Sequence, residues 1–166
     1  MSSGTSASPP GGRSGGVGLP AGLPDDVGAA IIQHTRYCAP DEACGLLGVD
    51  GDGSVVIAYC LPNVHSQRRR RFTVDPAGHY RAMRHAEAHG WSIGGSFHSH
   101  PGGPAIPSPT DIAGAFDPTW WYVIAGPLPR PEVRVYRIVA GVVTEVPTGV
   151  IAAARRPGAV MAGSTP

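Results

Sequence analysis

Two histidines and an aspartate give the sequence its clearest chemical pattern. They lie in Phe97-His98-Ser99-His100-Pro101 and, after a loop, in Ser108-Pro109-Thr110-Asp111. On a strand, residues two apart point to the same face, so His98 and His100 can direct two imidazoles to one point. Two imidazoles and a carboxylate are a common ligand set of catalytic zinc, which lowers the pKa of a bound water to about 7. The pattern predicts a hydrolytic zinc site with His98, His100 and Asp111 as ligands.

Such a site also needs a general base and a donor for the developing oxyanion. Glu42 directly precedes an apolar run that begins at Ala43, and burial there would raise the pKa of its carboxyl group. Ser108 lies three residues before Asp111, and its hydroxyl group can donate to an oxyanion. We therefore expect Glu42 to act as the base and Ser108 as the oxyanion donor.

Each of these residues also has an interpretation without chemistry. Ser108-Pro109-Thr110-Asp111 is typical of a helix N-terminus, although a rigid helix start would also hold a metal ligand well. His98 and His100 alone could be core or surface histidines, and Glu42 could pair with an arginine. Cys44, close to the predicted site, is expected to be a small buried residue.

The segments around these residues predict a layered α/β domain. Acids after Pro24 indicate one helix start, and Asp75-Pro76 indicates another helix that stops at Gly90. The apolar runs 43–49 and 55–60 flank Asp50-Gly51-Asp52-Gly53 and predict a hairpin. Further strands are predicted at 71–74, 92–99, 120–125, 133–139 and 142–146, with a helix from Ser108. Gly94-Gly95 indicates a close approach by another backbone.

Two further patterns invite functional interpretations. His85 and His89 lie four residues apart on a predicted helix, but the zincin pattern requires Glu where Ala86 stands. An exposed polar helix face is therefore the better interpretation of this pair. Arg68-Arg-Arg-Arg71 is typical of a solvated loop, and the functional alternative is a docking patch for an acidic partner protein.

Composition favours one globular domain with unstructured ends. The 166 residues include 24 Gly and 18 Pro, a share typical of low-complexity chains, but 42% are hydrophobic and 15% charged. Gly, Pro and Ser fill 16 of the first 24 positions. We expect a flexible leader at 1–24, a folded domain at 25–150 and a flexible tail at 151–166.

Charge and cysteine content limit the partners and the compartment. A formal net charge of +1 argues against a dedicated nucleic-acid binder. The three cysteines are an odd number without C-x-x-C spacing, which favours a reducing compartment. The N-terminus lacks signal-peptide features, and no apolar run approaches the roughly 20 residues of a membrane span. We therefore expect a soluble cytoplasmic protein without nucleic-acid or membrane partners.

The spacing of the site residues resembles that of the JAMM (JAB1/MPN-plus) zinc metalloproteases. Their pattern is a distant Glu, then His-x-His, seven residues and Ser-x-x-Asp, matched here by Glu42, His98-Ser99-His100 and Ser108-Pro-Thr-Asp111. The resemblance covers most of 25–147 and is strongest to small stand-alone bacterial members. It implies Zn²⁺ held by the two histidines and the aspartate, and a mixed β-sheet with flanking helices related to the cytidine-deaminase architecture.

The resemblance also implies an activity and a partner. Members of this type hydrolyse an amide or isopeptide bond at the C-terminal glycine of a ubiquitin-like or sulfur-carrier protein ending in Gly-Gly, and some release cysteine. One alternative is a broader isopeptidase or peptidase that acts on other conjugates. Another is a non-catalytic MPN-type binding module, but such modules typically lose ligand positions that this sequence retains. A zinc nucleoside deaminase is excluded because the sequence lacks the deaminase pattern, in which H-x-E is followed by P-C-x-x-C.

Overall fold

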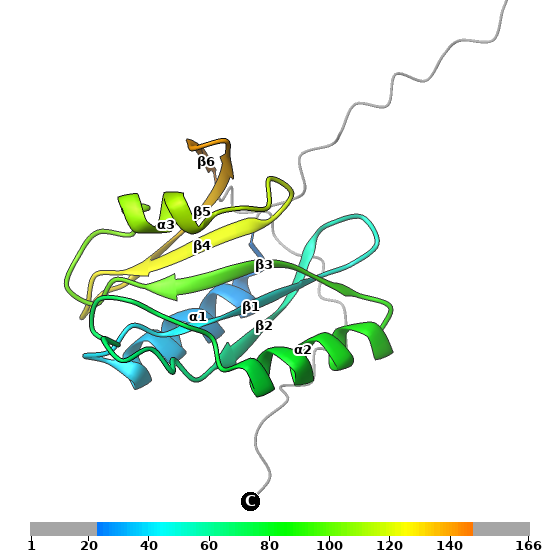
Figure 1. Ribbon diagram of the computed structural model, residues 1–166, viewed down its shortest axis with the longest axis horizontal. Coiled ribbons are helices and arrows are strands. Elements are labelled where there is room, and N and C mark those ends of the chain that lie inside the picture. The colour runs from blue at the N-terminus through cyan, green and yellow to red at the C-terminus, as the bar shows by residue number, and fades with distance from the viewer. Residues whose placement is uncertain (1–22, 148–166) are drawn as a thin grey trace, which may run out of the picture.

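A mixed six-stranded sheet forms the centre of the computed structural model, which describes residues 23–147 (Figure 1). The predicted leader lies outside the described residues except for 23 and 24, and the predicted tail lies wholly outside them. The elements in chain order are α1 (Asp25–Cys38), β1 (Cys44–Val49), β2 (Val55–Leu61), α2 (Pro76–Ala88), β3 (Ser92–Ser99), α3 (Pro109–Gly114), β4 (Trp121–Gly126), β5 (Glu132–Val139) and β6 (Val142–Val146). The predicted mixed sheet with flanking helices is confirmed.

The strand order is β2-β1-β3-β4-β5-β6. Only β3 and β4 pair in parallel, and the other neighbours are antiparallel. The central position of β3 therefore places its last residues between the start of β1 and the end of β4. No helix in the described part of the chain has the length and apolar character needed to cross a membrane.

Helix α1 covers one face of the sheet because its apolar residues recur on one side. Val27, Ile31 and Thr35 are its buried residues, and the first two join a core cluster with Leu47 and Phe97 from the strands. Asp25 and Asp26 lie in its first turn, where acids interact favourably with the helix dipole. The predicted helix start is confirmed.

Helices α2 and α3 lie on the opposite face from α1. Alternation along β2 turns Tyr59 away from α1 and toward α2, where its hydroxyl group meets His85 Nδ1 at 2.9 Å. On the same face of the sheet, Ile124 of β4 packs with Ile112 of α3. His98 pairs with Ile124 in the sheet register, so its side chain emerges on this α2/α3 face.

The predicted hairpin and the central strand are also confirmed. Strand β3 has the predicted bounds, and β1 and β2 pair across the Asp50–Gly53 turn. A Cβ atom at Gly95 would meet the backbone oxygen of Trp121, which explains why β3 needs glycine beside β4. Gly94 instead lies against the side chain of Val49.

The predicted strand at 71–74 is wrong. Within it only Val74 forms a bridge, with Asn63. The backbone oxygen of Arg71 accepts from Asn63 Nδ2 at 3.0 Å, and the Thr73 amide donates to Asn63 Oδ1 at 3.1 Å. The Asn63 side chain therefore takes part of the hydrogen bonding that a neighbouring strand would supply. The backbone contact is limited to that bridge, with the Val64 amide donating to the Thr73 oxygen at 2.9 Å, and the segment is a loop.

The predicted exposed polar face at His85 and His89 is only half correct. His89 is exposed, but His85 is partly buried and bonds to Tyr59. The His85 and His89 rings stack with centroids 4.2 Å apart, and His89 stacks on Trp91 at 4.9 Å. The pair contributes to packing between α2 and β2, a contact that helix periodicity alone does not indicate.

Candidate active site

Antiparallel pairing of β1 with β3 brings Glu42 to the two histidines. The register pairs Cys44 with His98. Because the strands are antiparallel, Glu42, two residues before Cys44, lies opposite His100, two residues after His98. Ser99, which points to the other face, fixes this junction, since its Oγ accepts from the Ala43 amide at 2.8 Å. Its own amide donates to the Ala43 oxygen at 2.9 Å. Residues 56 positions apart in sequence are thereby held side by side.

Strand β4 and the Gly/Pro-rich loop fix His100 from the other side. The His100 amide donates to the Ala125 oxygen at 2.8 Å, and a Cβ atom at Gly126 would meet the carbonyl oxygens of His100 and Gly103. Nδ1 of His100 lies 2.9 Å from the Pro104 carbonyl oxygen, which can only accept. Nδ1 therefore carries a proton, so that in the neutral form of the ring Nε2 presents its lone pair to the site.

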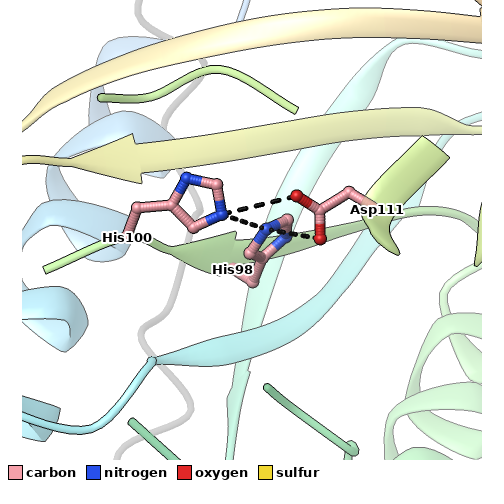
Figure 2. A group of neighbouring side chains, drawn as sticks. All are labelled: His98, His100 and Asp111. Carbon is pink, nitrogen blue, oxygen red and sulfur yellow. Dashed lines mark hydrogen bonds and ion pairs between the residues drawn. The ribbon is translucent and has the colours of Figure 1, made fainter. Parts of the chain in front are cut away.

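The three predicted ligands converge on one point (Figure 2). Nε2 of His98 lies 3.1 Å from Nε2 of His100 and 3.2 Å from Oδ1 of Asp111. Nε2 of His100 lies 3.4 Å from Oδ2 of Asp111. Among the described residues, these three side chains are the one group of at least three His, Cys, Asp or Glu residues close enough together to hold a metal ion.

The start of α3 orients Asp111. The amide of Ser108 donates to Asp111 Oδ2 at 2.7 Å, and the Asp111 amide donates to Ser108 Oγ at 3.2 Å, which together form a capping box. The helix-cap interpretation of this sequence is therefore correct, and it is compatible with a role in the site. The cap engages Ser108 Oγ as an acceptor, so its O–H remains available to donate to another group.

Burial shapes the ionisation of Glu42. The residue is only 7% exposed, and burial raises the pKa of its carboxyl group to about 7, with His100 opposing and Asp111 reinforcing the shift. The backbone amide of Glu42 donates to the Arg68 oxygen at 2.8 Å, and its carbonyl oxygen accepts from Asn63 Nδ2 at 3.0 Å. The backbone is anchored while the carboxyl group titrates near neutrality. The predicted effect of burial is confirmed.

The three converging side chains shift one another's ionisation. Burial raises the pKa of Asp111, but hydrogen bonds with His100, His98 and Ser108 outweigh this effect and hold the pKa well below its ordinary value. Burial lowers the pKa of His98 against the opposing effect of Asp111. The hydrogen bond to Asp111 raises the pKa of His100, with burial opposing. An ionised Asp111 and a neutral His98 are the protonation states that metal ligation requires.

These residues line a cleft of about 620 Å³. Its walls include all five predicted site residues, and the remaining wall comes from 101–103, from α3 and from a loop that carries Arg69, Arg70 and Arg71. A smaller cleft of about 410 Å³ lies at the start of β3 and contains none of the five. The structure therefore brings the predicted residues into one accessible space.

Two residues that sequence reasoning missed support this cleft. The Phe72 ring stacks on His98 with centroids 4.6 Å apart and an interplanar angle of 19°. Asn63 joins the loop before Phe72 to the backbone of Glu42. Neither contact has a local sequence signal, because both join segments that only the folded chain brings together.

Cys44 behaves as predicted. It is fully buried, and burial raises the pKa of its thiol to about 12, so it holds no thiolate at neutral pH. Its Sγ lies 3.7 Å from the Leu61 carbonyl oxygen, within the sheet. Cys44 is a packing residue beside the site.

Comparison with known proteins identifies the family of this site. The family described as prokaryotic homologs of the JAB domain matches residues 24–139, which contain all the elements that carry the site. The chain belongs to this family. The predicted resemblance to JAB1/MPN proteins is thus confirmed.

Similar proteins agree with membership of the JAB family. A CysO-cysteine peptidase of Mycobacterium tuberculosis is 36% identical over 132 residues, which span 76% of this chain and 88% of that protein. A probable TtuB-protein conjugate cleaving protease of Thermus thermophilus is 38% identical over 106 residues, 61% of this chain and 70% of that protein. The solution structure of protein DSY2949 from Desulfitobacterium hafniense has 34% identity and a TM-score of 0.64, and the match covers 74% of this chain and 86% of that one.

Proposed function

We propose that this protein is a zinc-dependent hydrolase of an amide or isopeptide bond at the C-terminal glycine of a ubiquitin-like or sulfur-carrier protein. The observation that carries the proposal is the convergence of His98, His100 and Asp111 within 3.1–3.4 Å, in the same cleft as the buried Glu42. We assign residues 25–150 to the catalytic unit. The three free thiols support action in a reducing compartment such as the cytoplasm.

The spacing of the three side chains fits zinc. Nitrogen and oxygen ligands about 2.0–2.2 Å from a tetrahedral zinc ion lie roughly 3.3–3.6 Å apart. The separations here are close to that range: 3.1 Å between the two Nε2 atoms, 3.2 Å from His98 Nε2 to Asp111 Oδ1 and 3.4 Å from His100 Nε2 to Asp111 Oδ2. Bound zinc would polarise the scissile carbonyl and lower the pKa of water at the site.

Glu42 would move the proton in this reaction. Its carboxyl group shares the cleft with the three ligand residues, so its carboxylate can accept a proton from the attacking water and then pass it to the leaving amine. Burial in the folded chain raises the pKa of this carboxyl group to about 7, which makes its carboxylate a stronger base than one with an ordinary pKa. The anchored backbone of Glu42 keeps the group in place during both transfers.

Ser108 would stabilise the negative charge that develops on the scissile oxygen. Its Oγ is fixed by the Asp111 amide, and its O–H is free to donate into the cleft. The α3 cap orients the hydroxyl group before substrate binds, so little reorganisation accompanies the reaction. Ser108 and Asp111 therefore act as one unit, the first toward substrate and the second toward the metal.

The named relatives support the substrate class. One is a peptidase of CysO-cysteine and another a protease of TtuB-protein conjugates, so both act at a junction between a named protein and an attached group. A Gly-Gly terminus has no side chains, which suits a cleft already lined by the Phe72 ring and the two histidines. A non-catalytic binding module would have no use for the buried carboxyl group of Glu42 beside a complete ligand set.

The experiment that tests this proposal uses CysO carrying a C-terminal cysteine as substrate. We expect the purified protein to release cysteine, a chelator to abolish release, and added Zn²⁺ to restore it. Glu42→Ala should bind zinc and release cysteine at least about a hundredfold more slowly. Full activity of Glu42→Ala would refute the mechanism, and wild type without bound zinc would favour a binding module. Cleavage of a TtuB-protein conjugate but not of CysO-cysteine would identify a broader isopeptidase.

A further inference from the structure

We infer that Arg70 and Arg71 form a docking surface for an acidic face of the carrier protein, on the rim of the catalytic cleft. This inference rests on the proposed function and adds the feature by which the protein partner is recognised. Both side chains line the cleft that holds His98, His100 and Asp111, and both residues are exposed. A protein whose C-terminus enters the cleft must therefore pass beside two guanidinium groups.

The ion pairs of the arginine run divide it into two halves. Arg68 Nε lies 3.0 Å from Asp41 Oδ2, and Arg69 Nε lies 4.0 Å from Asp41 Oδ1. Within residues 23–147, neither Arg70 nor Arg71 has a carboxylate within 4.0 Å. Asp41 thus offsets one of the two positive charges of Arg68 and Arg69. Arg70 and Arg71, which line the cleft together with Arg69, have no carboxylate partner among the described residues.

The loop that carries these charges is held in a defined shape. Oδ1 of Asn63 accepts from the His65 and Thr73 amides at 3.0 and 3.1 Å, which closes the base of the loop at 63–73. The amides of Arg70 and Arg71 donate to the Gln67 oxygen at 3.0 and 3.1 Å, which forms the turn at its tip. The loop is also tied to the Glu42 backbone, so the charges have a fixed position relative to the reacting groups.

Adjacent like charges repel one another, and this cost is recovered only when an anionic group binds. Arginine suits a protein carboxylate because its planar fork donates two parallel hydrogen bonds. The two side chains are exposed at the cleft rim, which fits contact with Asp or Glu side chains on a partner's surface. Capture of the carboxylate of a small leaving group would instead require an arginine buried in the cleft.

The test combines binding and cleavage. The double charge reversal Arg70→Glu/Arg71→Glu is compared with wild type and with Arg36→Glu. Arg36→Glu controls for charge reversal away from the cleft, because Arg36 is exposed, has no carboxylate within 4.0 Å in the described chain and does not line the cleft. The probes are CysO, the CysO-cysteine adduct and a short peptide with the same C-terminal residues. Binding of CysO is measured with the chelated protein, so it is independent of metal loading.

At low salt we expect the double substitution to raise the Kd for CysO about ten- to hundredfold. It should lower kcat/KM for the adduct by a similar factor, mainly by raising KM. Cleavage of the short peptide should change by less than about twofold, because the peptide lacks a folded acidic face. Raising the salt concentration should weaken wild-type binding and reduce the difference between the two proteins. Arg36→Glu should match wild type in all three assays.

The outcomes separate the two proposals. If wild type cleaves neither the adduct nor the peptide, the proposed function fails and this inference fails with it. If wild type cleaves the adduct and the double variant keeps its kcat/KM and Kd within twofold, only the docking surface is refuted. Equal loss on the adduct and the peptide would also refute it, since the arginines would then act on the reacting tail. Loss by Arg36→Glu would indicate a general charge effect and overturn the inference as well.

Discussion

Replacing Glu42 with glutamine is expected to make the protein more stable above neutral pH and nearly inactive. Glutamine has almost the same shape as glutamate but neither ionises nor accepts a proton. The Glu42 side chain is buried, and its pKa of about 7 lies above the ordinary value of 4.5. The folded state therefore resists ionisation of a group that the unfolded chain ionises freely.

The size and sign of the effect follow from this shift. Between pH 4.5 and 7 the folded protein holds a proton on Glu42 that the unfolded chain has lost, so the free energy of unfolding falls as pH rises. Above pH 7 the loss is nearly complete and amounts to at most about 3–4 kcal/mol, at roughly 1.4 kcal/mol per pKa unit. Glu42→Gln removes this loss. We expect a gain of about 1–3 kcal/mol at pH 8 relative to pH 5, with activity reduced about 10²–10⁴-fold.

Urea unfolding of the chelated protein at pH 5 and pH 8 measures the stability effect, because chelation removes any cation that would change the pKa of Glu42. The difference between the two pH values cancels the constant cost of packing an amide. Glu87→Gln is the control, since Glu87 is exposed on α2 and its one ion pair within residues 23–147 is with Arg84 at 2.7 Å. Its effect should stay within about 0.5 kcal/mol at both pH values. If the difference in free energy of unfolding between Glu42→Gln and wild type is the same at pH 8 as at pH 5, the reasoning is refuted.

Four further substitutions test other parts of the account. Asp111→Asn should retain α3, because an amide oxygen can still accept from the Ser108 amide. It should weaken zinc binding at least about a hundredfold in a titration, whereas the control Asp117→Asn should leave zinc binding unchanged. Ser108→Ala should lower kcat about 10²–10³-fold and stability by about 1 kcal/mol, and Ser108→Thr should restore both. Cys44→Ala should keep kcat/KM within about twofold, and a thiol-blocking reagent should not inhibit wild type. Asn63→Ala should lower the free energy of unfolding by about 1–3 kcal/mol, because two backbone oxygens lose their donor.

Much of this site could be predicted because local sequence determines it. Alternation along β3 directs His98 and His100 to one point, and the Ser108 cap sets the direction of Asp111. Each feature depends on a few neighbouring residues, so its spacing in sequence carries over to space. Glu42 is more distant in sequence. The family pattern implied its role, but its position depends on the pairing of β1 with β3, which the sequence did not predict.

The remaining features depend on contacts between distant segments. The segment 71–74, expected as a strand, is a loop with a single bridge, and the side chain of Asn63, eight residues before Arg71, takes part of the hydrogen bonding that a strand would use. The stacking of Phe72 on His98 requires that loop to fold over the end of β3. Helix periodicity predicted a polar face at His85, but Tyr59 from β2 covers it. Such contacts leave no periodic trace in the sequence.

The central claim is that one zinc ion, held by His98, His100 and Asp111, supports cleavage at the C-terminal glycine of a carrier protein. A titration of Zn²⁺ into the chelated protein, with cysteine release from CysO-cysteine as the readout, tests this claim most directly. The account predicts no release without zinc, a linear rise with added zinc and a break at one ion per chain. Release by the fully chelated protein, or activity that does not respond to zinc, would contradict it.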